Sequence, residues 1–275
     1  MKHTKKLIPA IGMLLLSACM LVTSTFAWFS MNESVTATNM SVKAKGDQVY
    51  LQIINPTSAT ESQKAFVNGA AQTSADATLQ SSEILPVNVV NAIDTQDAKK
   101  VVAYKGDGTL VWVTNIGEST AVGTAKTVYS DVTSTANTTN GKYFLKNTFQ
   151  IRLDPTAGAT AASDPLEIAS ITTNTTADAF QACMNVLVVA TYGTGETAKS
   201  FGQVWEFNGT NFVKKTGADA LSDGAFTAAN PATVDIYVFF NGDDADCTQE
   251  KLAAAKTTNY TVEVQFTVGG ATQGA

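Results

Sequence analysis

The sequence predicts an all-β protein, an antiparallel β-sandwich or barrel that follows a cleaved N-terminal signal helix. About ten segments alternate apolar and polar residues or form short apolar runs, and turn-forming residues separate them. Helical periodicity is almost absent. Charged residues make up only 15% of the chain. The Thr, Ser, Asn and Gly that take their place suit exposed strands and turns.

The N-terminus has the layout of a secretory signal peptide. Residues 1–6 are basic and residues 7–22 form an uncharged apolar run. The small residues Thr25 and Ala27 then occupy the −3 and −1 positions of a cleavage site before Trp28. The predicted divisions are a signal peptide over 1–27, an assembly segment with the first strand over 28–45, and a β-sandwich domain over 46–275.

The N-terminal segment has two alternative interpretations besides a signal peptide that is cleaved after Ala27. Residues 16–19 (LSAC) fit a lipobox, in which Cys19 would carry a lipid. The residues after Cys19 stay largely apolar, however, whereas lipoprotein tethers are usually polar. Extension of the apolar run through Phe29 would instead give an uncleaved membrane anchor.

The first predicted strands follow a polar, Thr-rich stretch. Met40, Val42 and Ala44 alternate with polar residues, as in a half-buried strand, and residues 49–53 alternate next. Residues 57–82 are rich in Ala, Ser, Thr and Gln and predict a long surface loop.

Two segments read as β-hairpins. Residues 101–104 and 110–113 flank a Gly-bearing loop, and residues 205–207 and 212–214 flank Asn208-Gly209-Thr210-Asn211. Further strands are predicted over 84–93, 143–153, 166–172, 182–192, 234–240 and 260–268, with a short helix over 248–256. The apolar run 182–192 predicts a central strand.

The charged residues limit the function. The net charge is −6, and loss of Lys2, Lys5 and Lys6 with the leader leaves 15 basic against 24 acidic residues, or −9. Arg152 is the only arginine, which disfavours nucleic-acid binding. His3 is the only histidine, so the processed chain would lack histidine bases and ligands. We therefore expect neither an enzyme nor a bound cofactor.

Three sets of residues are candidates for other chemistry. Asp243, Asp244 and Asp246 supply oxygen ligands for Ca²⁺, although a solvated acidic turn explains them as well. Cys183 and Cys247 could form a disulfide, contributing roughly 4 kcal/mol, or stay as thiols. Trp112, Trp205 and Tyr192 could form a glycan platform, or pack in the core.

Residues 23–46 (TSTFAWFSMNESVTATNMSVKAKG) resemble the processing region of the TasA and camelysin-type biofilm-matrix proteins of Gram-positive bacteria. In this family an aromatic–alanine pair, here Phe26-Ala27, precedes an aromatic-rich mature start, and a SipW-type signal peptidase cuts there. The resemblance implies a jelly-roll sandwich that assembles into extracellular fibres. Camelysin has been described as a metalloprotease, but this chain has no HExxH motif, so that activity is not carried over.

In fibre-forming relatives the N-terminal segment of one subunit adds as a strand to the next. The resemblance places this role on residues 28–42, with Phe29, Val35 and Ala37 as the inserted side chains and Trp28, Met40 and Val42 as further members of the assembly segment. The expected protein is therefore a secreted or cell-surface homopolymer of a Gram-positive-type bacterium, handled by a signal peptidase during export. The alternative is a monomeric surface adhesin or glycan-binding sandwich, whose partner would be a glycan or matrix component.

Overall fold

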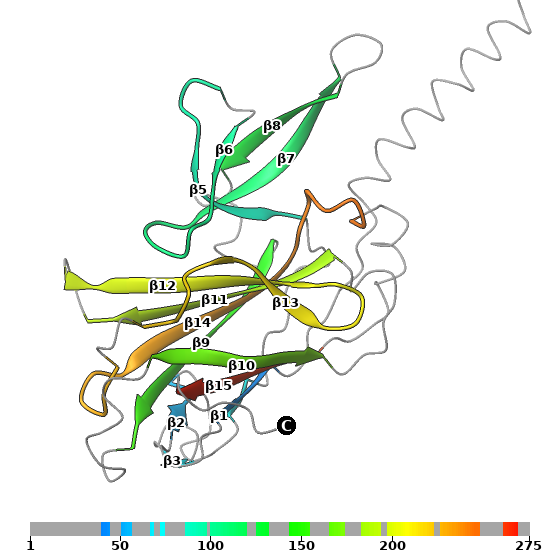
Figure 1. Cartoon of the computed structure of the whole chain (residues 1–275). Helices are drawn as coiled ribbons and strands as arrows, with labels where there is room; N and C mark the ends of the chain where they lie inside the picture. The colour runs from blue at the N-terminus through cyan, green and yellow to red at the C-terminus, as the bar shows by residue number, and fades with distance from the viewer. Residues whose placement is uncertain are drawn as a thin grey trace, which may run out of the picture.

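The computed structural model describes residues 40–44, 51–56, 67–68, 72–74, 86–97, 100–119, 125–131, 143–154, 165–173, 183–193, 197–222, 226–247 and 261–268. These residues form fifteen strands in three sheets (Figure 1). The predicted all-β sandwich is confirmed. The signal peptide, the cleavage site and the predicted helix over 248–256 lie outside the described residues.

Each sheet has a defined strand order. The seven-stranded sheet runs β13 (Phe212–Gly217), β12 (Lys199–Phe207), β11 (Met184–Tyr192), β14 (Ala232–Phe240), β9 (Phe144–Leu153), β2 (Leu51–Ile54), β3 (Val67–Asn68). One four-stranded sheet runs β10 (Leu166–Thr173), β15 (Val262–Val268), β1 (Met40–Ala44), β4 (Gln72–Ser74). The other runs β6 (Val101–Ala103), β5 (Asn88–Ile93), β7 (Val111–Ser119), β8 (Ala125–Asp131).

The central position predicted for residues 182–192 is confirmed by β11. This strand lies between β12 and β14, and it is buried along almost its whole length. Val186 and Val188 contribute to one apolar cluster, whereas Leu187 and Val189 contribute to another on the opposite face. Because successive side chains point to opposite faces of a sheet, a continuous apolar run is what a strand between two packed layers needs.

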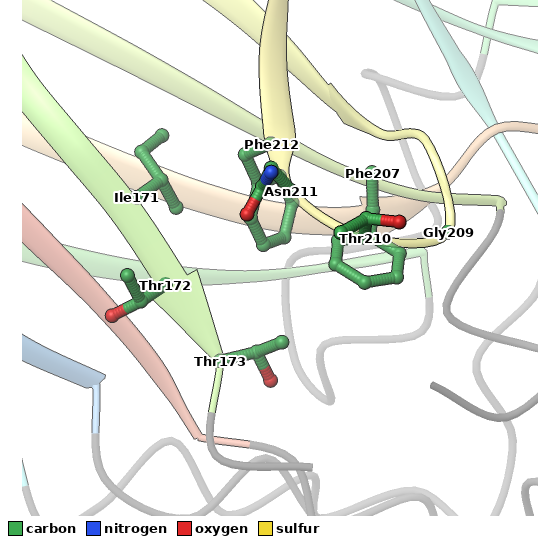
Figure 2. A pocket seen from close by; sticks show the side chains of 8 residues that line it. All are labelled: Ile171, Thr172, Thr173, Phe207, Gly209, Thr210, Asn211 and Phe212. Atoms are coloured by element: carbon green, nitrogen blue, oxygen red, sulfur yellow. The ribbon is translucent and has the colours of Figure 1, made fainter. Parts of the chain in front are cut away.

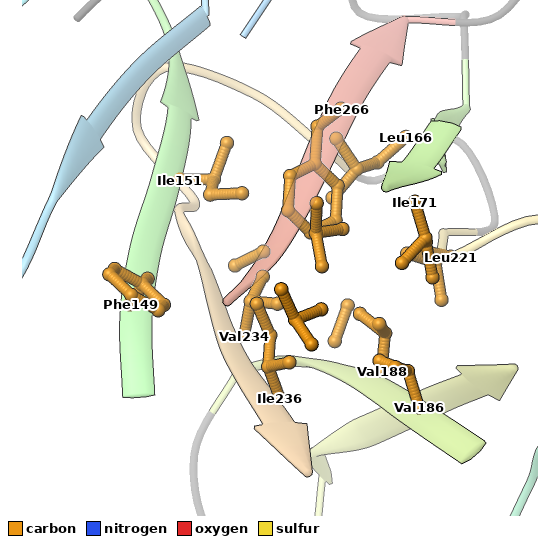
Figure 3. Close-up of a cluster of buried hydrophobic side chains, with 14 of the residues drawn as sticks. Phe149, Ile151, Leu166, Ile171, Val186, Val188, Leu221, Val234, Ile236 and Phe266 are labelled. Carbon is orange, nitrogen blue, oxygen red and sulfur yellow. The ribbon is translucent and has the colours of Figure 1, made fainter. Parts of the chain in front are cut away.

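The larger core lies between the seven-stranded sheet and the sheet that contains β10 and β15. Figure 3 shows Leu166, Ile171 and Phe266 facing side chains from β9, β11 and β14. Strand β15 alternates strictly between buried and half-buried residues, as a strand with one covered face should. Strand β1 pairs with β15 in parallel, with Ser41 opposite Glu263, whereas every other strand pair in the described part of the chain is antiparallel.

A third layer covers the other face of the seven-stranded sheet. Trp112 on β7 stacks on Phe144 of β9 with ring centroids 4.2 Å apart, and it meets Phe239 of β14 edge-on at 5.1 Å. Val87 and Tyr104 complete this second core. The expected sandwich has two sheets, and the structure adds this third one to it.

The predicted hairpin between residues 101–104 and 110–113 is wrong. Strands β6 and β7 do not pair, because β5 lies between them. The intervening loop docks instead on the seven-stranded sheet, where the Gly106 carbonyl accepts a hydrogen bond from the Gly202 N–H at 2.7 Å. The Thr216 hydroxyl donates to the Tyr104 carbonyl at 2.6 Å. These contacts hold the loop open, so it does not close as a tight turn.

Other departures are smaller. The segment 57–82, predicted as a loop, contains the short strands β3 and β4. Strand β8 was not predicted. Residues 51–54 are all buried rather than alternating, within a strand that pairs with β9 on one side and β3 on the other.

Candidate functional site

The residues predicted to drive assembly are only partly described. Thr25, Phe26, Ala27, Trp28, Phe29, Val35 and Ala37 lie outside the described residues. Met40 and Val42 lie on β1, which pairs with β15 on one side and with β4 on the other. The first strand is therefore an internal strand of its own sheet.

A groove lies between two outermost strands at one end of the sandwich (Figure 2). Its volume is about 340 Å³. One wall comes from the end of β10 and the other from the β12–β13 hairpin, so the groove runs between the two sheets of the larger core. It is lined by Ile171, Thr172, Thr173, Phe207, Gly209, Thr210, Asn211 and Phe212.

The groove has an apolar floor and a neutral polar rim. Ile171, Phe207 and Phe212 form the floor, and they are 5%, 4% and 7% exposed. The two phenyl rings lie 5.2 Å apart at 60°. Thr172, Thr210 and Asn211 form the exposed rim. Such a surface can receive apolar side chains while hydroxyl and amide groups bind a neighbouring backbone or sugar.

The hairpin wall was predicted from sequence and is confirmed. Phe207 pairs with Phe212, and the Asn208 N–H donates to the Asn211 carbonyl at 3.0 Å. The Asn208 side-chain oxygen accepts from the N–H groups of Thr210 and Asn211. Gly209 has a φ of 91°, a conformation that glycine adopts readily. The turn therefore fixes both phenylalanines next to each other.

The β10 wall is a sheet edge. Within the described residues β10 pairs with β15 alone and ends its sheet. Leu166, its first residue, uses its N–H and carbonyl to bind Ser222 and Leu221, both at 2.8 Å. This cap covers only the start of the strand. The groove lies at the other end, beside Ile171, Thr172 and Thr173.

A smaller, acidic hollow of about 200 Å³ lies near the same hairpin, and Glu206, Asp244 and Asp246 contribute to its lining. Lys215 binds the Glu206 carboxylate at 2.6 Å. Burial raises the pKa of Glu206, the ion pair with Lys215 lowers it, and a hydrogen bond with Asp244 raises it again. The net result is a pKa above the ordinary range, so Glu206 holds its proton more tightly than an exposed glutamate.

The calcium candidates form turns and cross-links in the loop after β14. Asp243 accepts a hydrogen bond from the Asn88 side chain at 2.6 Å, and Asp244 accepts one from the Asp246 N–H at 2.8 Å. Among the described residues no three histidine, cysteine or carboxylate side chains gather closely enough to hold a metal ion.

The two cysteines lie together. Cys183 precedes β11 and is fully buried, and Cys247 is half-buried at the end of the loop after β14. Their thiols lie within hydrogen-bonding reach of each other. This contact, together with burial, raises the pKa of Cys183.

The three aromatic residues considered as a glycan platform do not form one. Trp112 and Tyr192 are 3% and 4% exposed and pack in different clusters. Trp205 is half-buried, and its indole N–H donates to Gln203 at 3.2 Å. The packing interpretation therefore holds for Trp112 and Tyr192.

Sequence reasoning missed the groove. Its two walls lie far apart in the chain, and only the sheet order brings them together. The one local signal was the Phe–Asn–Gly–Thr–Asn–Phe segment (207–212), which places two aromatics on either side of a tight turn.

Among the described residues there is no helix with the length and apolar character to span a membrane. No protein-family model, no curated protein and no solved structure matches this chain.

Proposed function

We propose that this protein is exported and serves as a structural subunit of an extracellular matrix fibre or surface layer. Residues 28–39 of one copy would add as a strand to a neighbouring copy. The protein would act outside a Gram-positive-type bacterium after cleavage by a signal peptidase, with copies of itself as its main partners and no catalytic role.

The observation that carries this proposal is the open edge of β10 beside the groove. Strand addition needs unpaired backbone groups next to pockets for alternate side chains. Among the described strands, β10 has β15 as its one neighbour at Ile171 and Thr172, so its other side supplies the backbone, and the apolar floor of Ile171, Phe207 and Phe212 supplies the pocket. Open edges of this kind are usually covered or blunted in proteins that stay monomeric.

The incoming segment fits the groove in polarity. Residues 28–38 (WFSMNESVTAT) carry Glu33 as their only charged residue, and the groove lining carries no charge. Phe29, Val35 and Ala37 would supply apolar groups for the floor. Ser30, Asn32, Ser34 and Thr36 occupy the alternate positions and would meet the Thr and Asn rim.

Strand β1, to which the proposed segment connects, lies close to the groove. Ser41 on β1 and Thr172 on β10 are both paired with Glu263 of β15, from opposite sides. The two residues are therefore about 10 Å apart. Because the proposed segment connects to Met40 at the start of β1, it can reach its own groove or that of a neighbour. Insertion into its own groove would close the molecule as a monomer, which is the state that the adhesin alternative requires.

The test compares the exported protein with a variant that lacks residues 28–38, by electron microscopy and size-exclusion chromatography. The intact protein is expected to form filaments or sheets, and the truncated protein is expected to remain monomeric. Polymers formed by the truncated protein would overturn the proposal. An intact protein that stays monomeric would overturn it as well and would favour the adhesin or glycan-binding alternative.

A matched pair of substitutions locates the acceptor. Thr172→Lys places a charge on the rim of the groove, whereas Thr109→Lys places the same charge on an exposed loop of the third layer. Thr172→Lys should impair polymerisation and Thr109→Lys should leave it unchanged. Equal polymerisation of the two variants would argue against this groove.

A further inference from the structure

The loop after β14 holds the third layer against the sandwich. The Val87 N–H donates to the Phe240 carbonyl at 2.8 Å, and the Gly242 N–H donates to the Val87 carbonyl at 3.3 Å. The Asn88 side chain donates to Asp243 at 2.6 Å. Val87 precedes β5 and Asn88 is its first residue, so this loop holds the start of the third sheet.

Cys183 is hydrogen-bonded to the start of this loop, and Cys247 lies at its end. The Cys183 carbonyl accepts a hydrogen bond from the Asn241 N–H at 2.9 Å, which fixes the start of the loop to the core. The Cys247 N–H donates to the Asp244 carbonyl at 2.9 Å, which turns the end of the loop back. These two backbone contacts place Cys247 against the buried cluster that contains Cys183.

We propose that Cys183 and Cys247 become oxidised to a disulfide in the exported protein and that this bond fixes the loop on which the third layer sits. The proposal rests on the export stated under the proposed function, because disulfides persist in oxidising compartments. It assigns a covalent cross-link to a pair that the core already holds in contact.

The oxidant is a disulfide of a thiol–disulfide oxidoreductase. Cys247 is the more exposed thiol, so its thiolate attacks the oxidant disulfide first and forms a mixed disulfide. The Cys183 thiolate then attacks the sulfur of Cys247 and releases the oxidant as a dithiol. Two S–H bonds and the S–S bond of the oxidant break, one protein S–S bond forms, and the oxidant takes up both protons and both electrons.

Peptide mapping tests the bond directly. The exported protein is denatured with an alkylating agent and without reductant, and then digested with trypsin. Cleavage after Arg152, Lys199, Lys215 and Lys251 places the cysteines on peptides 153–199 and 216–251. We expect one linked species, about 2 Da lighter than the two thiol peptides together. Separate peptides alkylated without reductant would overturn the proposal.

Hydrogen exchange tests the role of the bond. Reductant should speed exchange at Val87 and Gly242 severalfold in the wild-type protein and leave a Cys247→Ala variant unaffected. If the wild-type protein is as insensitive to reductant as the variant, the bond does not fix the loop. The disulfide and the assembly can fail independently. If the protein polymerises but its cysteines are alkylated without reductant, only the disulfide proposal is overturned. If the cysteines are linked but the protein stays monomeric, only the proposed function is overturned.

Discussion

At the base of the β12–β13 hairpin, Glu206 lies between a cation and a second carboxylate. Its pKa is raised chiefly by burial, which together with the smaller effect of the hydrogen bond with Asp244 exceeds the lowering by Lys215. The folded protein therefore binds this proton more tightly than the unfolded chain does. Such a group favours folding fully below its ordinary pKa, and it loses that contribution as the pH rises through the raised pKa.

Asp94 provides the opposite case. It accepts hydrogen bonds from the N–H groups of Gln96 and Asp97 at 2.8 and 3.2 Å, and these bonds lower its pKa. Its contribution to folding is present above the ordinary pKa of aspartate and is lost as the pH falls through the lowered value.

We predict that Glu206→Gln and Asp94→Asn change the pH dependence of stability in opposite directions. As the pH falls from about 7 to about 4, the wild-type protein should gain unfolding free energy relative to Glu206→Gln and lose it relative to Asp94→Asn. Urea denaturation of the three proteins across this range measures both differences. Parallel pH profiles for the wild type and Glu206→Gln would contradict the burial of the Glu206 carboxyl group.

The sequence predicts the exposure of such residues only in part. Strand alternation predicts that Glu206 lies on the face opposite Trp205 and Phe207, and the pairing of β12 with β11 agrees with this prediction. Alternation carries no information about Asp244, which arrives from a loop after a different strand. The same limit applies to Trp112 of the third layer, which is buried against β9 and β14 of the seven-stranded sheet.

At the level of elements, the loop of residues 104–110 shows how glycine permits a close approach between layers. Gly106 has a φ of 89°, and a side chain there would meet the backbone of Ala218, Gly202 and Gly217. Gly108 has a similar φ of 78°, but the nearest atom to an added methyl group would be the Asn91 side-chain nitrogen at 3.7 Å. Substitution of Gly108 therefore tests backbone strain alone, whereas substitution of Gly106 tests backbone strain together with a steric clash.

We predict that Gly106→Ala destabilises the protein much more than Gly108→Ala. Gly108→Ala should cost about 1–2 kcal/mol for the left-handed backbone, whereas Gly106→Ala should cost about 3 kcal/mol or more, because the loop must also move off the sheet. The unfolding free energy in urea gives both values. Equal losses would indicate that the loop does not dock on β12 and β13.

This loop also explains why one predicted hairpin is right and the other wrong. Asn208 caps its own turn, so residues 205–214 contain all the information that their pairing needs. The turn between residues 104 and 110 has similar sequence signals, but its hydrogen bonds go to Gly202 and Thr216. Local propensity alone does not reveal those distant contacts.

For the whole molecule, the sequence predicts the all-β class and the central strand, because both follow from the local pattern of apolar and polar residues. It does not predict the third layer or the parallel pairing of β1 with β15, since both depend on which strands meet. The groove was missed for the same reason. A residue such as Thr172 becomes a candidate only when β10 is known to end its sheet.

The most direct test of the assembly proposal places a photo-reactive residue at Thr172 and maps its cross-links by mass spectrometry in polymers of mixed isotope-labelled and unlabelled subunits. We predict cross-links from position 172 to residues 28–39 of another copy, and none of this kind from the same group placed at Thr109. Polymers in which position 172 cross-links only within its own chain, or to other regions of the neighbour, would contradict strand addition at β10.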